Sequence, residues 1–371
     1  MTAVESRPPA GSHRRPPRTW RRRAAMPALI GVLFLATVVP SGLGLYNPYI
    51  QLVLIYIGVN IVLTVSLNLV NGYMGEFSVG HAAFMGVGAY VSSVTTVALV
   101  IGNPRLGGPL LPEASSLVVF PLSLLLGGVA AAVFGLLVAI PSFRVRGDYL
   151  AIITLAVNFI FKSLVENLDV IGGPRGFLGM TRVTSAMGRA VDVPWTMIWA
   201  FVATVGTVYV VHSLVNSTFG KAIVAIREDE IAAELMTVDT RRVKVVAFLL
   251  SCGLAGVAGG LFAHVLGFIN PAGFGILKST EVLVMVYLGG MGSITGSVLS
   301  AAGLTVLLEA MRPLHVFRWV LIPLLLILLM RFRPTGLMGS RELTDVFPAL
   351  RRWFGRPPED EHFEHTGGRV S

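Results

Sequence analysis

Two groups of residues in this sequence have types and spacing that could serve a function inside so apolar a chain. In the first group, Glu76 and His81 stand close together beside Gly75, Ser78 and Gly80. Ionisable groups at membrane depth are expensive and usually face a cavity or a partner. Clustered glycines permit a broken helix whose free amides meet a carboxylate ligand. We therefore expect this stretch to line a translocation path; the alternative is that Glu76 and His81 pair with each other, or with backbone, at a helix junction.

The second group lies in a charged stretch, residues 220–236, made mostly of good helix formers. By i, i+3, i+4 spacing, one face of this stretch is apolar and comprises Ile231, Ala232, Leu235 and Met236. Glu230 and Glu234 take the other side. A short amphipathic helix of this kind rests on the lipid surface or inserts into a groove on a partner protein. Because acidic residues disfavour contact with anionic lipid, the pattern favours the partner.

The rest of the sequence must place these groups in a bilayer. The chain has 371 residues, of which 54% are hydrophobic and 13% charged, against roughly 25% charged in an average soluble domain. Its apolar residues fall in blocks of about 18–25, the length of helix that crosses the hydrocarbon core. Alternating strands of about ten residues do not occur, so helices are favoured over a barrel. The composition predicts an all-α, polytopic integral membrane protein.

Candidate spans follow an apolar anchor helix that begins at residue 26. They run near 48–70, 77–101, 117–140, 149–166, 195–215, 245–269, 280–310 and 317–331. The 280–310 stretch is too long for one plain span and contains Gly289, Gly290 and Gly292, so we expect a broken or re-entrant helix, or two short passes. Transporters place such breaks near the substrate site, which makes these three glycines a second candidate part of the path. Ten spans is the expected number, with eight as the alternative.

The charge distribution predicts the topology. The formal net charge is +9, but the basic residues lie at the chain ends and in loops, where they act as positive-inside determinants rather than as a nucleic-acid surface. Residues 1–25 are predicted to form a disordered basic cytoplasmic tail. Residues 26–333 are predicted to form the transmembrane domain, with one charged cytoplasmic loop over 216–244, and residues 334–371 a cytoplasmic C-terminal tail. Alternation places 141–148 inside and 167–194 outside, although the latter carries Arg175, Arg182 and Arg189.

Other polar or small residues have simpler explanations. Small-x-x-x-small spacing, which lets helices approach closely, occurs at Ala255, Gly256, Gly259 and Gly260. Glu281 lies near a predicted span end, where snorkelling explains its charge, and the lone Cys252 is a packing residue. Neither a metal-ligand spacing of His, Cys and Asp nor a Ser/His/Asp arrangement is identifiable, so no metal site and no enzyme is predicted.

Six segments between about residues 55 and 340 resemble, in order, the permeases of branched-chain amino-acid ABC transporters. They read LNLVNGYMGEFSVGHAAFMGVGAY (67–90), RVRGDYLAIITL (144–155), GGPRGF (172–177), GKAIVAIREDEIAAELM with the following RVKVVAFLLSCGLAGVAGGLFAH (220–264), LGGMGSITGSVLSA (288–301) and FRPTGLMG (332–339). The Arg-Gly-Asp-Tyr segment and the closing Phe-Arg-Pro block make the chain most similar to the LivM subunits of this LivH/LivM group.

The resemblance implies a role for the 220–236 stretch. In such permeases it is the segment that couples the membrane domain to cytoplasmic ATPases, formed here by Arg227, Glu228, Asp229, Glu230, Ile231, Ala232, Ala233, Glu234, Leu235 and Met236. The family usually has glycine after the methionine, where it ends the helix in a left-handed turn. In this sequence Thr237 stands at that position.

The resemblance also implies partners and a substrate class. The chain would be a permease subunit of an ATP-driven importer in a bacterial inner membrane, with both termini cytoplasmic. It would act with a second permease, as a heterodimer, with two ATP-binding subunits and an extracytoplasmic binding protein. No G-x-x-x-x-G-K-[ST] loop occurs, so ATP is expected on the partners and no cofactor on this chain. The expected substrate is a branched-chain amino acid or a related small polar solute; the alternatives are a urea or amide importer of the same family and a self-contained secondary transporter or channel.

Overall fold

The chain is described by a computed structural model that covers residues 20–102, 107–143, 149–191, 193–314, 317–332 and 336–339. Within these residues, seven helical segments are long and apolar enough to cross a membrane. They are Pro48–Tyr73 (α2 with a π-helical last turn), His81–Ile101 (α3, likewise), Glu113–Ser142 (α4 after a 3-10 turn), Tyr149–Glu166 (α5), Trp195–Val215 (α7), Thr240–Leu266 (α10) and Pro271–Gly289 (α11 after a 3-10 turn). The expected all-α, multi-pass membrane protein is therefore confirmed.

Three further apolar helices correspond to the remaining expected spans. They are α1 (Trp20–Gly42), α12 (Ile294–Ala310) and α13 (Phe317–Phe332). Helix α1 begins six residues before the expected boundary at residue 26, so the proposed tail overlaps it. Residues 1–19, the basic part of the loop over 144–148 and residues 340–371 lie outside the described part of the chain.

The long 280–310 stretch forms a helical hairpin. Helix α11 ends at Gly289 and α12 begins at Ile294, with Gly290 and Gly292 between them at φ +109° and +84°. The Ser300 hydroxyl donates to the carbonyl oxygen of Met285 at 2.6 Å, and a Cβ at Gly289 would meet the carbonyl of Gly296. These contacts pair residues in opposite order along the two helices. Of the expected alternatives, the structure has two short antiparallel helices.

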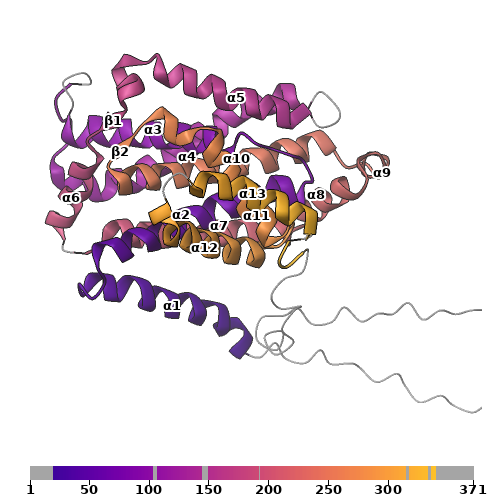
Figure 1. Ribbon diagram of the computed structural model, residues 1–371, viewed down its shortest axis with the longest axis horizontal. Helices are drawn as coiled ribbons and strands as arrows, with labels where there is room; N and C mark the ends of the chain where they lie inside the picture. The colour runs from indigo at the N-terminus through magenta and orange to yellow at the C-terminus, as the bar shows by residue number, and fades with distance from the viewer. Residues whose placement is uncertain are drawn as a thin grey trace, which may run out of the picture.

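Helix α10 packs at the centre of the bundle against α3 and α4 (Figure 1). The small residues that the sequence singled out make this possible. A Cβ at Gly259 would overlap the carbonyl oxygen of Met85, and one at Gly256 would lie 2.7 Å from the carbonyl oxygen of Gly127. Because glycine has no Cβ, the backbones approach to contact distance. The predicted close packing along α10 is confirmed.

The helices run between two ends of the molecule that differ in structure (Figure 1). One end, at the right, carries the short helices α8 (Thr218–Glu228) and α9 (Glu230–Leu235). The other carries α6 (Met180–Ala190) and a two-residue strand pair, β1 (Phe177–Leu178) antiparallel to β2 (Phe268–Ile269), with Phe177 opposite Ile269. The sequence did not predict this strand pair. It joins the loop after α5 to the loop after α10, because the two spans end at the same level.

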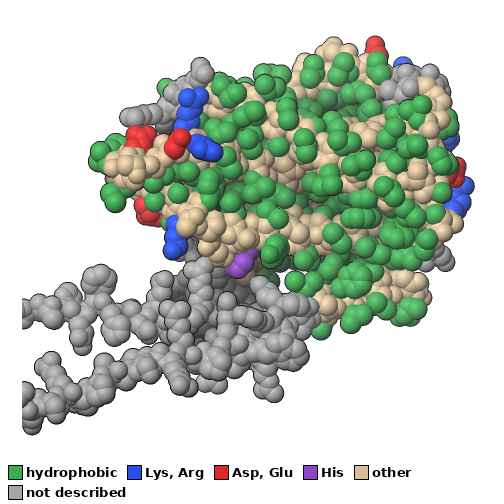
Figure 2. Space-filling model, turned by 180° about the vertical axis from the view of Figure 1, so that it is seen from behind, with side chains coloured by type: hydrophobic (Ala, Val, Ile, Leu, Met, Phe, Trp, Pro, Cys, Tyr) green, Lys and Arg blue, Asp and Glu red, His purple; other side chains and the backbone are tan. Residues whose placement is uncertain are grey.

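Hydrophobic side chains cover the middle of the molecule, and charged ones gather toward its ends (Figure 2). On α4, for example, Leu125, Val129 and Val133 point outward and are largely exposed. An outward-facing apolar band is what a bilayer requires of a spanning protein. Helix α1 ends beside Pro194, which precedes α7 at the α6 end; it therefore begins at the α9 end, where residues 336–339 also lie.

Candidate functional site

The first candidate path segment is a genuine break between α2 and α3. After the π-helical turn Leu69–Tyr73 the chain is non-helical through residues 74–80, and Gly75 adopts φ +75°. The Asn71 side chain closes the break, because its Oδ1 accepts from the Ser78 amide at 3.2 Å and its Nδ2 donates to the Ser78 carbonyl at 3.4 Å. One amide side chain thus satisfies the backbone that the missing helix leaves open.

At the end of the break that leads into α3, the buried residues include Ser78, Gly80 and His81. The His81 Nε2 lies 2.9 Å from the Ser66 hydroxyl on α2, and a Cβ at Gly80 would overlap the carbonyl of Thr154 on α5. The alternative in which His81 pairs with Glu76 is therefore wrong. Whether these residues line a translocation path stays a prediction.

Glu76 belongs instead to an ionic cluster at the α9 end. The ammonium group of Lys244, in the first turns of α10, lies 2.7 Å from Glu76 Oε1 and 2.8 Å from Glu230 Oε1 on α9. The Lys244 side chain is almost buried, whereas that of Glu230 is partly exposed. A single lysine thus bridges the helix break and the short helix of the charged loop, two segments far apart in sequence.

Arg227, the second cation of this region, reaches both helix breaks. Its Nη1 donates to the Gly72 carbonyl oxygen at 3.1 Å. A Cβ at Gly75 would lie 2.6 Å from Arg227 Cγ, and one at Gly292 would lie 3.4 Å from Nη1. Glycine is therefore needed at position 75 both for its positive φ and for the close approach of the arginine. The α8 C-terminus sits where the two predicted breaks meet.

Asn68 connects the two breaks directly. Its Oδ1 accepts from the Gly292 amide at 3.0 Å, while its Nδ2 donates to the Ser293 carbonyl at 3.0 Å and to the Ser297 hydroxyl at 2.8 Å. On the other side of the second break, Gly290 packs closely against Gly339, so residues 336–339 cover the turn. The glycines predicted in two separate segments form one junction, which we call the coupling junction: Gly72, Gly75, Glu76, Arg227, Glu230, Lys244 and Gly292.

The charged loop itself is two helices rather than one. Asp229 is extended at φ −158°, which ends α8, and its Oδ1 accepts from the amides of Ile231 and Ala232 at 2.9 and 3.0 Å, which begins α9. This is an N-cap, and it turns the chain sharply between the helices.

The predicted apolar face of α9 is confirmed as exposed, with one correction. Ile231, Leu235 and Met236 are 63%, 79% and 77% exposed, and Ala232 is also exposed. Ala233, which the resemblance placed in the coupling segment, is 5% exposed and packs inward. Successive side chains of a helix point about 100° apart, so Ala232 faces outward whereas Ala233 packs against the rest of the chain.

Thr237 preserves the turn that the family makes with glycine. Its φ is +64°, and no other described non-glycine residue has a positive φ. The Val238 amide donates to the Ala233 carbonyl at 3.1 Å and the Thr237 amide to the Glu234 carbonyl at 3.0 Å. This is a Schellman motif at the C-terminus of α9. Thr237 occupies its left-handed position, where a residue with a Cβ is strained.

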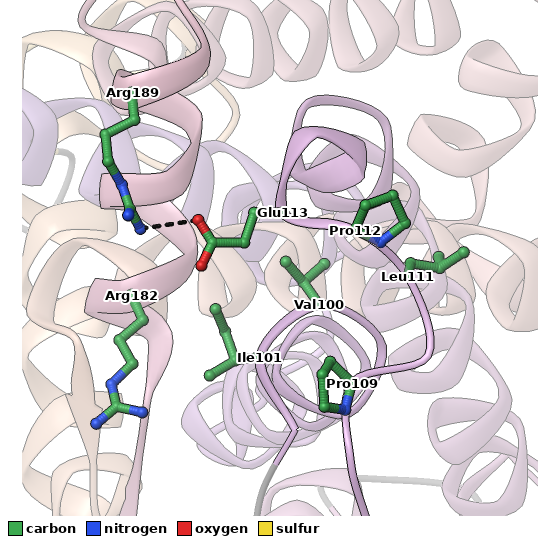
Figure 3. Close-up of a pocket in the computed structure, with 8 residues that line it drawn as sticks. All are labelled: Val100, Ile101, Pro109, Leu111, Pro112, Glu113, Arg182 and Arg189. Carbon is green, nitrogen blue, oxygen red and sulfur yellow. Dashed lines mark ion pairs between the residues drawn. The ribbon is translucent and has the colours of Figure 1, made fainter.

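A shallow pocket of about 320 Å³ lies at the opposite end (Figure 3). Arg189 on α6 and Glu113 point toward each other across it, with Arg189 Nη2 and Glu113 Oε2 3.0 Å apart, while the Arg182 guanidinium points away. Because both paired side chains are well exposed, this ion pair contributes no more than about 1 kcal/mol. The pair does account for one of the three arginines that the positive-inside rule would not place at this end, because Arg189 has an acidic partner beside it.

Sequence reasoning missed Lys244, Asn68 and Lys278. The signal available for Lys244 and Lys278 is a basic residue placed inside a predominantly apolar helix. Lys278 forms a 3.0 Å ion pair with Glu281 inside α11. The described residues contain no group of three or more His, Cys, Asp or Glu side chains placed to hold a metal ion.

Comparison with known proteins gives a consistent result. A sequence model of the family described as "branched-chain amino acid transport system / permease component" matches residues 49–331. The LivM permease protein of the high-affinity branched-chain amino acid transport system of Escherichia coli K12 is 33% identical over 302 residues, which cover 75% of this chain and 67% of that protein. The LivH permease protein of the Salmonella typhimurium system is 26% identical over 299 residues, 76% of this chain and 92% of that protein. No solved structure matches.

Proposed function

The chain belongs to the branched-chain amino acid transport system permease family, with LivM as its nearer subunit type, and is a permease subunit of an ABC-type importer; from this premise we propose that separate ATPase subunits drive it through α9 and that it carries branched-chain amino acids. The observation that carries the proposal is the geometry of α9. This helix presents an exposed apolar face outward, and Lys244 joins it to the first helix break. Arg227, at the end of the preceding helix α8, contacts both breaks.

A partner protein explains α9 better than lipid does. The helix is six residues long, too short to be stable on its own propensity, and acidic side chains at positions 228, 229 and 234 surround its apolar residues. An anionic membrane surface repels such a helix. A groove on another protein buries Ile231, Leu235 and Met236 and offers basic groups to the acidic rim.

The coupling junction supports a mechanism for energy transfer. When the ATPases close on ATP, a displacement of α9 pulls on Lys244 through Glu230, and a displacement of α8 pulls on Gly72 through Arg227. Both forces reach the breaks at 74–80 and 290–293, which are joined by Asn68. Non-helical segments absorb changes in backbone angle more easily than continuous helices do, so movement there alternates access between the two faces.

The remaining partners follow from the two ends of the molecule. The end with α8 and α9 is assigned to the cytoplasm, together with both termini, because the loop over 216–244 is the most charged internal loop and carries five Lys and Arg residues. The end with α6 then faces outward and receives an extracytoplasmic binding protein. A second permease chain completes the membrane unit as a heterodimer in a bacterial inner membrane.

Reconstitution tests the proposal. The chain is purified with a LivH-type permease, two ATPase subunits and the binding protein, and the complex is placed in liposomes with ATP inside. We expect uptake of leucine, isoleucine and valine that requires both ATP and the binding protein, and no uptake of urea or short amides. Uptake by this chain alone, without ATPases, would contradict the proposal and favour a self-contained transporter.

A further inference from the structure

The most buried charged pair outside the coupling junction lies on α11. Lys278 Nζ is 3.0 Å from Glu281 Oε1, and each side chain is only 14% exposed. The same ammonium group donates to Asn60 Oδ1 on α2 at 3.1 Å and lies 5.9 Å from the centre of the Phe262 ring on α10. Three helices therefore contribute to one small polar site.

This site lies at mid-depth. Asn60 is in the 26-residue span Pro48–Tyr73, and at 1.5 Å per residue it stands about 18 Å from Pro48 and about 20 Å from Tyr73. The explanation of Glu281 by snorkelling is therefore wrong, because its partner Lys278 contacts Asn60, which lies near the middle of its span. Helix α11 begins at Ile276 rather than at a surface. Lys278 and Glu281, in its first two turns, therefore lie in the interior.

Stability does not account for an ion pair at this depth. Removing two charges from water is costly, and replacing a buried pair with apolar side chains of similar volume is often neutral or stabilising. Charged side chains inside membrane proteins instead mark ligand and ion pathways. The pair needs a functional reason to be present.

The chemistry of the site matches an aliphatic α-amino acid. Such a molecule carries a carboxylate and an ammonium group on one carbon, and a hydrocarbon side chain. Lys278 has three N–H donors for a carboxylate, and the Glu281 carboxylate has acceptor capacity beyond the single oxygen that contacts Lys278. Phe262, whose ring centre is 5.9 Å from that of Tyr56, offers an apolar wall for the side chain.

A second polar cluster lies on the same two helices, nearer the α6 end. Asn60 Nδ2 donates to the Thr305 hydroxyl at 2.9 Å. One turn further along α12, Glu309 accepts from the Tyr49 hydroxyl at 2.7 Å and pairs with Arg312 at 3.0 Å. Paired polar groups thus occur along α2 and α12 at mid-depth and again at the outer end.

We propose that Lys278, Glu281 and Asn60 bind the charged groups of a zwitterionic aliphatic amino acid at mid-depth, with Lys278 taking its carboxylate and Glu281 its ammonium group. On binding, the substrate replaces the contact between the two side chains, so neither charge is left unpaired. This inference rests on the importer function proposed above and names the residues that recognise its substrate.

The experiment separates recognition from energy coupling. In the reconstituted full complex, uptake of labelled leucine and ATP hydrolysis stimulated by the loaded binding protein are measured in the same vesicles. In the double variant Lys278→Met/Glu281→Leu we expect ATP hydrolysis within about twofold of the unmodified complex and uptake lower by about tenfold or more, because two charged contacts to the substrate are lost. The matched control, Lys162→Met/Glu166→Leu, removes an exposed i, i+4 pair on α5 and should transport normally.

A charge exchange guards against a simple folding defect. Lys278→Glu/Glu281→Lys keeps an ion pair at the same place but reverses its direction, so it should assemble and hydrolyse ATP while failing in uptake. Uptake within about twofold of the unmodified complex in either variant would overturn the proposal, and loss of membrane assembly in both would assign the pair a structural role and overturn it too. An unmodified complex that shows no uptake would instead refute the importer function, and the site would fall with it.

Discussion

The ammonium nitrogen of Lys244 lies 2.7 Å from a carboxylate oxygen of Glu76, and this contact joins the central helix α10 to the break before α3. Because the same nitrogen also contacts Glu230, it links α9 to the break as well. Glu76, which the sequence assigned to the translocation path, and Glu230, which it assigned to the charged loop, therefore share a single cation.

Replacing Lys244 with Met should uncouple the complex. Without the cation, the Glu76 and Glu230 carboxylates repel each other and α9 loses its connection to the 74–80 break. We expect the ATPase subunits to remain bound and to hydrolyse ATP, while leucine uptake per ATP falls by about fivefold or more. Lys244→Arg keeps the charge and should restore most of the uptake. Equal coupling ratios for the Met variant and the unmodified complex would refute the role.

Replacing Ala232 with Arg should prevent docking of the ATPases. Ala232 is exposed beside Ile231 and Leu235, so a long charged side chain there blocks the apolar face without disturbing the fold. We expect co-purification of the ATPases to fall by about tenfold or more. Ala190→Arg, a similar change at an exposed position at the other end of the molecule, is the control. Normal ATPase binding by the Ala232 variant would favour a lipid-surface role for α9.

Position 233 requires the opposite expectation. Ala233 is buried against this chain, so Ala233→Arg should reduce folding and membrane assembly rather than docking alone. Comparing fluorescence size-exclusion profiles of the two alanine variants tests this difference. A monodisperse Ala233 variant at normal yield would contradict it.

Replacing Thr237 with Gly should stabilise the chain. A left-handed conformation costs a non-glycine residue roughly 1–2 kcal/mol, and the greater backbone entropy of glycine offsets part of the gain. We expect a net increase of about 0.5–1 kcal/mol, seen as a small rise in the melting temperature of the solubilised protein. Ser185→Gly, at an exposed position inside α6, should instead lower it.

Adding one methyl group at Gly259 should disrupt the bundle. A Cβ there overlaps the Met85 carbonyl oxygen, and overpacking of a tight core costs about 1–3 kcal/mol. The matched control is Gly206→Ala in α7, where nothing lies within 4 Å of the added Cβ. Thermal unfolding in detergent should separate the two variants clearly. A Gly259→Ala protein as stable as the control would show that α3 and α10 can move apart.

Single cysteines test which end faces the cytoplasm. A cysteine at Ser185 on α6 should react with an impermeant thiol reagent added outside intact cells, and a cysteine at Ser217, beside α8, should react only after the membrane is opened. The native Cys252 is buried and should stay unlabelled in both. Labelling of the Ser217 variant from outside would invert the assigned orientation.

The sequence by itself determined the features that depend on local pattern. Helices across a bilayer satisfy their own backbone, so apolar blocks of span length were enough to predict the fold class, and α5 and α7 begin and end where the pattern placed them. Glycine clusters predicted both helix breaks, since the residues that permit a break are local to it. The exposed face of α9 followed from helical spacing for the same reason.

Only the tertiary structure decided how these pieces meet. Arg227 lies within one junction with Gly75 and Gly292 because spans distant in sequence end at the same level, and no local pattern records that level. The same holds for the partners of charges: Glu76 finds Lys244 rather than His81, and Glu281 pairs with Lys278 near Asn60 at mid-depth rather than at a surface. A charge in an apolar helix must find a partner, but which helix supplies that partner is settled by packing.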